Sequence, residues 1–267
     1  MGPTISESAE ALRIRGKYFF SQGKDRESLA DLTKSLEFEP YNAEALRIRG
    51  RIYFLQGRDR ESLMDLTKSL SIEPNNTEAL RTRGKIYFSQ GKDRESLVDL
   101  NKSLALEPND ADSLRIRGKI YLLLGRYEES LADINKSLDL RPNNADLLRI
   151  RGKTYCQLGQ YEKSLEDLTR SLDLEPDNTD ALITRGDTYS ILGKYEESLA
   201  DSTKSLDLEP NNADLLRIRG MTYCLLGRYE ESLNDLHRSL ELEPGNADAW
   251  KICDIINSAI GCDYEYD

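Results

Sequence analysis

Seven prolines stand 34 residues apart along this chain, and two series of glycines repeat with the same step. The units defined by this step tile residues 9–246 without an insertion. A fixed period of this length favours stacked repeats, in which each unit contacts its neighbours, over a single globular core. The prolines are Pro40, Pro74, Pro108, Pro142, Pro176, Pro210 and Pro244.

The unit from Ala111 to Asn144 indicates what each repeat forms. Apolar residues recur at helical spacing from Leu114 onward, and Gly125 then tolerates the left-handed backbone that ends a helix. A second stretch of helical spacing runs up to Pro142, which cannot continue the hydrogen bonding of a helix. Each unit is therefore predicted to be a helical hairpin that is too small to bury its own apolar face.

With Ala111 as position 1, this unit resembles the tetratricopeptide repeat in its length, its helical hairpin and one residue pattern. The pattern is Leu114, Gly118, Tyr121, Gly125, Tyr127, Leu138 and Pro142. The resemblance covers all seven units and implies an all-α, right-handed superhelical solenoid of helix-turn-helix repeats. It also implies that the first helices line a concave groove for a protein or peptide partner. The chain departs from the family by Arg at position 7, usually Leu, and by Ser at positions 20 and 27, usually Ala.

The domain organisation follows from the period. Residues 1–8 are a leader, residues 247–260 restart a first helix and form a capping helix, and residues 261–267 are an acidic tail. Trp250, Ile255 and Ile256 of the capping helix are expected to face the seventh repeat. The seven repeats are 9–42, 43–76, 77–110, 111–144, 145–178, 179–212 and 213–246.

Arginine at position 7 and aspartate at position 23 recur together in every repeat, as in Arg117 and Asp133. A charge pair between the two helices of one hairpin would explain both series, because an unpaired charge on the buried side is costly. Contact of these arginines with a ligand is the alternative. The serines at positions 20 and 27 either allow close helix packing or bond to the preceding turn.

Basic residues also form two rows on the face that the resemblance assigns to the groove, at positions 5 and 9 of repeats one to five. In one interpretation they pair with the acidic residue at position 2 of the same helix, three residues away. In the other, the two rows repel each other until an anionic ligand binds. Phenylalanines at position 12 either add aromatic pockets to the groove or fill the seam between adjacent first helices. The candidate groove residues are Arg13, Lys17, Phe20, Arg47, Arg51, Phe54, Arg81, Lys85, Phe88, Arg115, Lys119, Arg149 and Lys153.

Repeat six interrupts these rows with Ile183 and Asp187. It also carries Ser202 at position 24, where the other repeats have Leu or Ile. A hydroxyl at a packed apolar position costs on the order of 2–4 kcal/mol. Repeat six is therefore predicted to open most easily.

Composition narrows the class of function. The net charge of −11 argues against general affinity for nucleic acid or for an anionic membrane. No apolar run reaches the length of a membrane span. The four cysteines lack metal-ligand spacing, and Cys156 and Cys224 stand at the same position two repeats apart, too far to pair in a regular stack. This favours a reducing, cytoplasmic or nuclear setting. No nucleophile has an accompanying base, so we expect no catalytic residues, no metal and no cofactor.

The sequence thus predicts a non-catalytic interaction scaffold that binds an acidic or phosphorylated peptide in a basic concave groove. The alternative is a structural spacer, or a solenoid that self-associates through its ends or its acidic tail.

Overall fold

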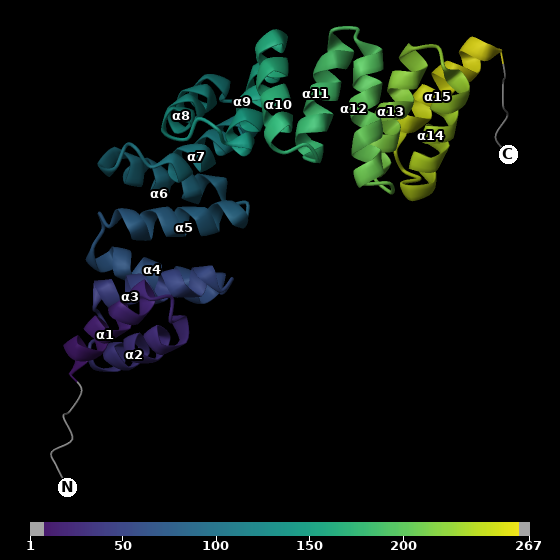
Figure 1. Cartoon of the computed structure of the whole chain (residues 1–267). Helices are drawn as coiled ribbons and strands as arrows, with labels where there is room; N and C mark the ends of the chain where they lie inside the picture. The colour runs from purple at the N-terminus through teal and green to yellow at the C-terminus, as the bar shows by residue number, and fades with distance from the viewer. Residues whose placement is uncertain (1–7, 262–267) are drawn as a thin grey trace. The chain divides into compact units, whose positions relative to one another are not determined.

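The computed structural model describes residues 8–261, where the chain forms fifteen α-helices (Figure 1). All but Ser8 of the predicted leader, and all but Gly261 of the predicted acidic tail, lie outside the described residues. The chain divides into two compact units, residues 1–140 and residues 141–267, and each is described by itself. The predicted all-α fold of helical hairpins is confirmed.

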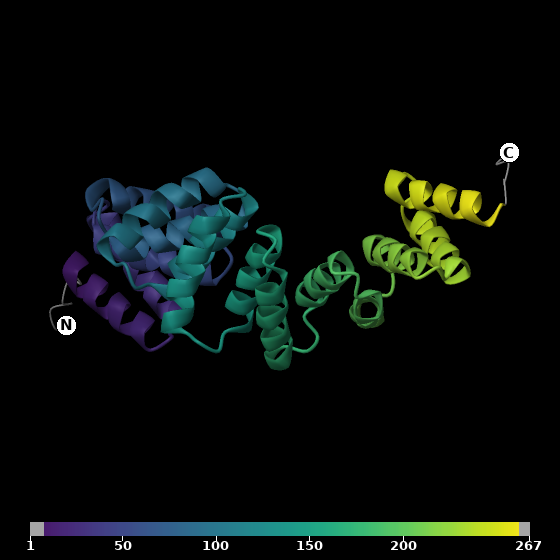
Figure 2. The same ribbon diagram turned by 90° about the horizontal axis from the view of Figure 1, so that it is seen from above.

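The first unit consists of four hairpins, and the second of three hairpins followed by one helix (Figures 1 and 2). The helices of the first unit are α1 (Ala9–Ser21), α2 (Asp25–Phe38), α3 (Ala43–Leu55), α4 (Asp59–Ile72), α5 (Thr77–Ser89), α6 (Asp93–Leu106), α7 (Ala111–Leu123) and α8 (Tyr127–Leu140). Those of the second unit are α9 (Ala145–Gln157), α10 (Tyr161–Leu174), α11 (Thr179–Ile191), α12 (Tyr195–Leu208), α13 (Ala213–Leu225), α14 (Tyr229–Leu242) and α15 (Ala247–Ile260).

The first helix of each repeat begins at a polar N-cap and ends at a glycine turn. The side chain of Asn42, for example, accepts a hydrogen bond from the backbone N–H of Ala45 at 3.0 Å, which satisfies one of the free donors of the first turn. Gly57 follows α3 with φ of 70°, a conformation that a side chain would strain. The second helix, α4, then ends two residues before Pro74.

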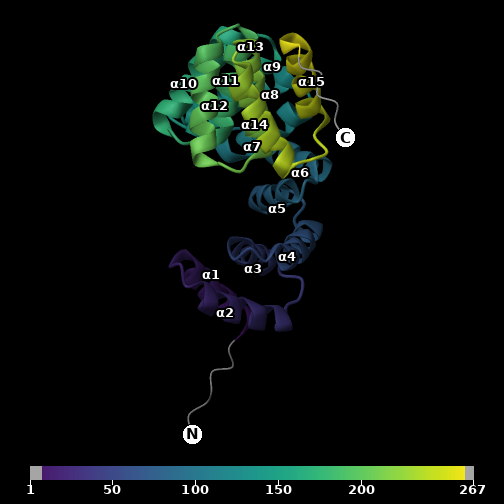
Figure 3. The same cartoon turned by 90° about the vertical axis from the view of Figure 1, so that its right-hand side faces the viewer.

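The core of each unit forms where one hairpin meets the next. In the first unit, Leu32 and Leu36 of α2 are buried against Ala45, Ile48 and Ile52 of α3. The second helix of each hairpin packs on the following first helix, and neighbouring first helices such as α3 and α5 also touch. Figure 3 shows α3 and α5 of the first unit in succession. Stacking therefore buries the apolar face that one hairpin leaves exposed.

The glycine at position 8 lies inside the first helix, where it allows the two helices of a hairpin to approach closely. A Cβ built on Gly16 would lie 2.8 Å from Cγ of Leu32. In repeat six, Ser202 replaces that leucine, and a Cβ on Gly186 would meet its nearest atom, Cβ of Asp201, at 3.5 Å. The packing at this point is therefore looser in repeat six.

The predicted pairing of positions 7 and 23 is confirmed in all seven hairpins. Each arginine donates two hydrogen bonds, from Nε and Nη2, to the two carboxylate oxygens of its aspartate at 2.6–2.9 Å. Such bidentate geometry is the strongest form of this contact. The arginine replaces the usual apolar residue because it ties the two helices of one hairpin together.

The two serines make a different set of bonds from those considered above. Ser62 at position 20 donates to the carbonyl of Gly50 at 2.6 Å, and Ser69 at position 27 donates to the carbonyl of Ala43 at 2.9 Å. Both bonds cross from the second helix to the first. Of the seven serines at position 27, only Ser205 bonds to its preceding turn, through the carbonyl of Asp201. The two bonds therefore tie the second helix to the start and to the middle of the first helix.

The capping helix α15 differs in part from the prediction. Ile256 is fully buried, as expected, but Ile255 is 62% exposed and Trp250 is 38% exposed. Trp250 stands at position 4, which in other repeats is a leucine covered by its own hairpin, and no second helix follows α15 in the described chain. Its Nε1 donates to the carbonyl of Pro244 at 3.1 Å instead.

Candidate functional site

The basic rows of the first unit lie on its first helices and contact the next repeat rather than standing unpaired. Glu44, at position 2 of the second repeat, accepts hydrogen bonds from both Arg13 and Lys17 of the first. The distance from Nζ of Lys17 to the carboxylate is 2.6 Å. The bonds from Lys17 and Arg13 hold the pKa of Glu44 below its ordinary value of 4.5, although burial opposes this.

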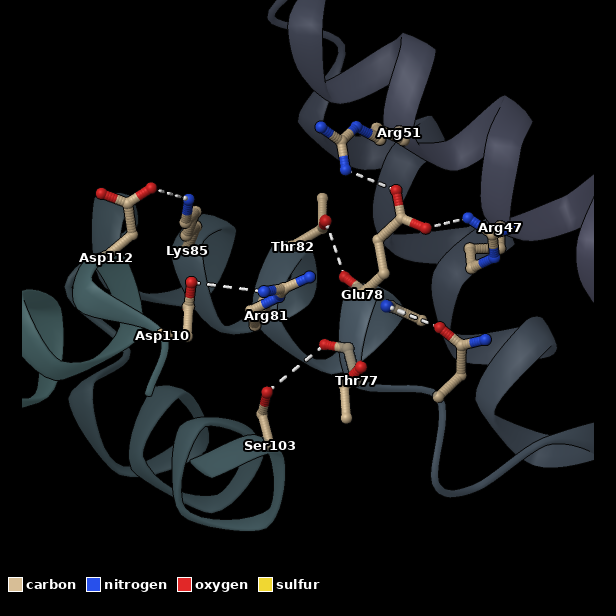
Figure 4. Close-up of polar contacts among 12 residues, drawn as sticks. Arg47, Arg51, Thr77, Glu78, Arg81, Thr82, Lys85, Ser103, Asp110 and Asp112 are labelled. Atoms are coloured by element: carbon tan, nitrogen blue, oxygen red, sulfur yellow. Dashed lines mark hydrogen bonds and ion pairs between the residues drawn. The ribbon is translucent and has the colours of Figure 1, made fainter. Parts of the chain in front are cut away.

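The junction between the second and third repeats has the same arrangement. Glu78 lies between Arg47 and Arg51 and accepts a hydrogen bond from each (Figure 4). We call this arrangement, in which the residues at positions 5 and 9 of one repeat hold the acid at position 2 of the next, the junction clamp. Its two cations exceed its single carboxylate by one charge.

The third junction contains more acidic side chains than the first two. Arg81 pairs with Asp110 at 3.2 Å, and Lys85 pairs with Asp112 at 3.5 Å (Figure 4). Arg81 also pairs with Glu107 at 3.5 Å. Asp110 also caps α7, because its carboxylate accepts the backbone N–H of Ser113 at 3.0 Å. The excess of positive charge is therefore confined to the first two junctions of the first unit.

These contacts correct both interpretations of the two rows. In the first two repeats these arginines and lysines pair with the acid of the following repeat. In the third, Lys85 does so, while Arg81 pairs with two acids that stand just before α7. The rows of these three repeats are therefore neither uncompensated nor paired within their own helix. Pairing within one helix occurs in the second unit. There Arg149 binds Asp146, Arg217 binds Asp214 and Lys251 binds Asp248.

The phenylalanines at position 12 fill the seam between repeats while keeping part of their surface exposed. Phe20 and Phe54 are half-buried and pack against the core that the following repeat completes. The guanidinium of Arg51 lies 5.9 Å from the ring centre of Phe20, and the ammonium of Lys119 lies 5.7 Å from that of Phe88. These cation–π contacts add to the junctions.

The predicted groove residues are divided between the two units. Arg115 and Lys119 are half-buried, Arg149 is 8% exposed, and Lys153 is exposed at the edge of a separate pocket in the second unit. In the first unit, a hollow of about 270 Å³ brings Arg51, Phe54, Arg81 and Lys85 together with the acids of the second and third junctions. The best-defined group of predicted residues is therefore that of repeats one to three.

Sequence reasoning missed the partner of each row. Glu44 follows Arg13 by 31 residues and Lys17 by 27. These separations are shorter than the 34-residue period by about one helical turn and about two helical turns. A test for charge pairs at these two separations would have found the junction clamps.

Other features of the described chain bear on the class of protein. No helix within residues 8–261 is both long and apolar enough to cross a membrane. Within the same range, no cluster of three or more histidine, cysteine, aspartate or glutamate side chains could hold a metal ion. Cys156, Cys224 and Cys253 are free thiols.

An array of helical hairpins joined by repeated ion pairs defines a helical-repeat protein. Tetratricopeptide repeat models match residues 118–186, 179–212 and 213–246, and a TPR repeat model matches residues 84–125. These matches together span more than half of the chain. The chain belongs to the tetratricopeptide repeat family, whose members are protein-interaction scaffolds.

Solved structures agree on the fold. A tetratricopeptide repeat protein from Parabacteroides merdae is 22% identical, with a TM-score of 0.62 over 94% of this chain and 99% of that one. YrrB, described as a TPR protein with an unusual peptide-binding site, is 22% identical, with a TM-score of 0.57 over 70% and 96%. PilW, a type IV pilus biogenesis factor, is 20% identical, with a TM-score of 0.68 over 79% and 97%. Comparison with curated proteins returns no match.

Proposed function

We propose that the first helices of repeats one to three bind an acidic or phosphorylated segment of a protein partner, without catalysis. The observation that carries the proposal is the composition of the first two junction clamps, in which two cations share one carboxylate. The side chain of Lys17 is 60% exposed and that of Arg51 is 41% exposed, so each can bind a further anion. A cytoplasmic or nuclear setting, inferred from the cysteines, belongs to the same proposal.

The hollow beside Phe54 supports an apolar anchor in the same segment. Phe54 and Leu55 line it together with Arg51, Arg81 and Lys85. An aromatic or aliphatic side chain would bury its surface there while neighbouring carboxylates or phosphates contact the basic groups. Such a segment binds more weakly as salt rises, because its ion pairs are exposed.

The test is selection from acidic and phosphorylated peptide libraries at low salt, using the full chain and the double variant Lys17→Gln with Arg51→Gln. A matched control is Arg26→Gln with Lys102→Gln, which removes the same charge from exposed positions on α2 and α6. We expect acidic peptides to be enriched by the wild type and by the control, and lost in the first variant. Equal enrichment by all three proteins would contradict the proposal.

A second candidate function, end-to-end association, is favoured by the exposed face of α1. Ile14 and Tyr18 are 57% and 59% exposed, whereas Ile48 and Ile52 at the same positions of α3 are 2% and 0% exposed. This face has the shape to receive a further hairpin, such as one from a second copy. Sedimentation at rising concentration should then show association that Ile14→Glu abolishes, and a monomer at every concentration would exclude this candidate.

A further inference from the structure

A pocket of about 440 Å³ lies in the second unit, between the first helices of repeats five, six and seven. It is a different site from the junction clamps of the first unit, and all of its lining residues fall within residues 153–222. The helices α9, α11 and α13 each contribute side chains. Its charged and apolar lining includes Lys153, Ile183, Asp187, Arg217 and Met221.

At this pocket, repeat six carries neither of the two cations that form a junction clamp. Ile183 and Asp187 occupy positions 5 and 9, where the clamp has two long cationic side chains. Asp214, at position 2 of repeat seven, therefore receives no cation from repeat six and pairs with Arg217 of its own helix at 3.4 Å. Its side chain is 68% exposed, against 25% for the clamped Glu44. Asp214 is therefore more open to solvent than the clamped acid of the first unit.

A further change in repeat six leaves room at this site. Ser190 stands at position 12, where the first three repeats carry phenylalanine, and it lines the pocket. The pocket is therefore lined by the small hydroxyl groups of Ser190 and Ser198 together with the apolar side chains of Ile183 and Met221.

Asp187 is the unmatched charge of this pocket. It lines the pocket and is exposed, and within the described chain its carboxylate makes no hydrogen bond and no ion pair. Burial by the surrounding protein raises the pKa of Asp187 above its ordinary value of 3.8, and the charges of Arg217 and Lys153 offset this only in part. A carboxylate in this environment gains from a cation placed against it.

We propose that this pocket binds a lysine or arginine side chain of a protein partner, flanked in that partner by acidic residues. The cation contacts Asp187, and the aliphatic stem lies along Ile183 and Met221, as long basic side chains do on apolar surface. Lys153 and Arg217 stand on either side and contact the flanking carboxylates. A wholly acidic segment is rejected here by Asp187, so repeat six selects a mixed-charge sequence.

The experiment uses the full chain and three capped peptides: Glu-Ala-Lys-Ala-Glu, Glu-Ala-Gln-Ala-Glu and Ala-Ala-Lys-Ala-Ala. Binding is followed by the NMR signal of the Met221 methyl group, which reports on the pocket wall at any affinity. We expect the first peptide to bind about tenfold more tightly than either of the others, because a hydrogen-bonded charge contributes about 1.5 kcal/mol or more.

Two variants assign the effect to the proposed contact. Asp187→Asn should remove the preference for lysine over glutamine, and Asp187→Lys should abolish binding while restoring a cation opposite Asp214. Asp139→Asn, an equal change at an exposed position on α8, should leave the preference intact. So should Lys17→Gln with Arg51→Gln, which separates this site from the proposed function of the first repeats.

Three results would overturn the proposal. They are equal shifts with the lysine and glutamine peptides, a lysine preference that persists in Asp187→Asn, or no change in the Met221 signal with any peptide. Equal binding of the first and third peptides would overturn the role of the flanking acids.

Discussion

The guanidinium of Arg49 donates two hydrogen bonds to the carboxylate of Asp65 on the facing helix, from Nε at 2.7 Å and from Nη2 at 2.9 Å. Both side chains are largely covered, at 18% and 10% exposure. Six other hairpins repeat this contact, so the array carries one such bond in each repeat. This ion pair lies beside Gly50, where the two helices are in close contact, so it holds the two helices of the hairpin together.

Removing one partner should therefore cost more than removing both. We expect Asp65→Ala to lower the free energy of unfolding by about 2–4 kcal/mol, because it leaves a partly buried guanidinium unpaired. The double variant Arg49→Leu with Asp65→Ala carries the family's usual leucine and should recover part of that loss. Urea unfolding measures the stability of both variants, and a double variant that is as unstable as Asp65→Ala, or more so, would contradict this account.

The junction clamp should make stability depend on pH. The pKa of Glu44 is lowered in the folded chain by Lys17 and Arg13, so its contribution is complete above its ordinary value of 4.5 and is lost as pH falls through the lowered pKa. Glu44→Gln should therefore be less stable than the wild type at neutral pH and equal to it in acid.

Glu10→Gln is the matched control for the clamp, because Glu10 occupies position 2 of the first repeat, before which no repeat supplies cations in the described chain. Thermal unfolding across this pH range should show little difference for the control. A pH-independent loss in Glu44→Gln would mean that the clamp is not the source.

Asp187 should change the stability of the fold with pH in the opposite direction to Glu44. Burial raises the pKa of Asp187, so between its ordinary value of 3.8 and its folded value the native chain binds more protons than the unfolded chain. Its ionisation therefore destabilises the fold as pH rises through that window. Asp187→Asn should be more stable than the wild type at neutral pH, and the gain should vanish in acid. A gain of the same size at every pH would show that charge is not its cause.

Replacing the position-8 glycine by alanine should change stability in opposite directions in repeats five and six. A Cβ on Gly152 would lie 2.8 Å from Cγ of Leu168 and 3.2 Å from the carbonyl oxygen of Ser164, so Gly152→Ala should destabilise the chain. Gly186→Ala meets only ordinary contacts and should stabilise it by about 0.5–1 kcal/mol through helix propensity. Denaturant midpoints of the two variants test this, and a shift in the same direction for both would contradict it.

Repeat six should gain stability when its missing side chain is restored. Ser202→Leu places the residue of most other hairpins under Gly186, where the space is open, and should add about 1–2 kcal/mol to the free energy of unfolding. Hydrogen exchange should show faster opening of α11 and α12 than of α9 and α10 in the wild type, and this difference should shrink in the variant. Uniform protection in the wild type would exclude a weak repeat six.

The sequence by itself determined the period, the helical hairpins and the Arg49–Asp65 type of pair. These features follow from local rules: apolar spacing, a capping side chain, a glycine turn, and two oppositely charged series within one hairpin. The sequence also predicts the weak packing at Ser202, because the other six repeats all carry a leucine or isoleucine at that position.

Only the tertiary structure decided the partners of the basic rows. A carboxylate at position 2 can pair with the basic residue three positions further along its own helix, as Asp214 does. It can instead accept hydrogen bonds from the basic residues of the preceding repeat, as Glu44 does. Sequence spacing allows both. Contacts between adjacent first helices select the second at the first two junctions, whereas the first occurs in the second unit. The pocket at Asp187 has the same origin, since it appears where three neighbouring helices meet and one of them lacks the clamp.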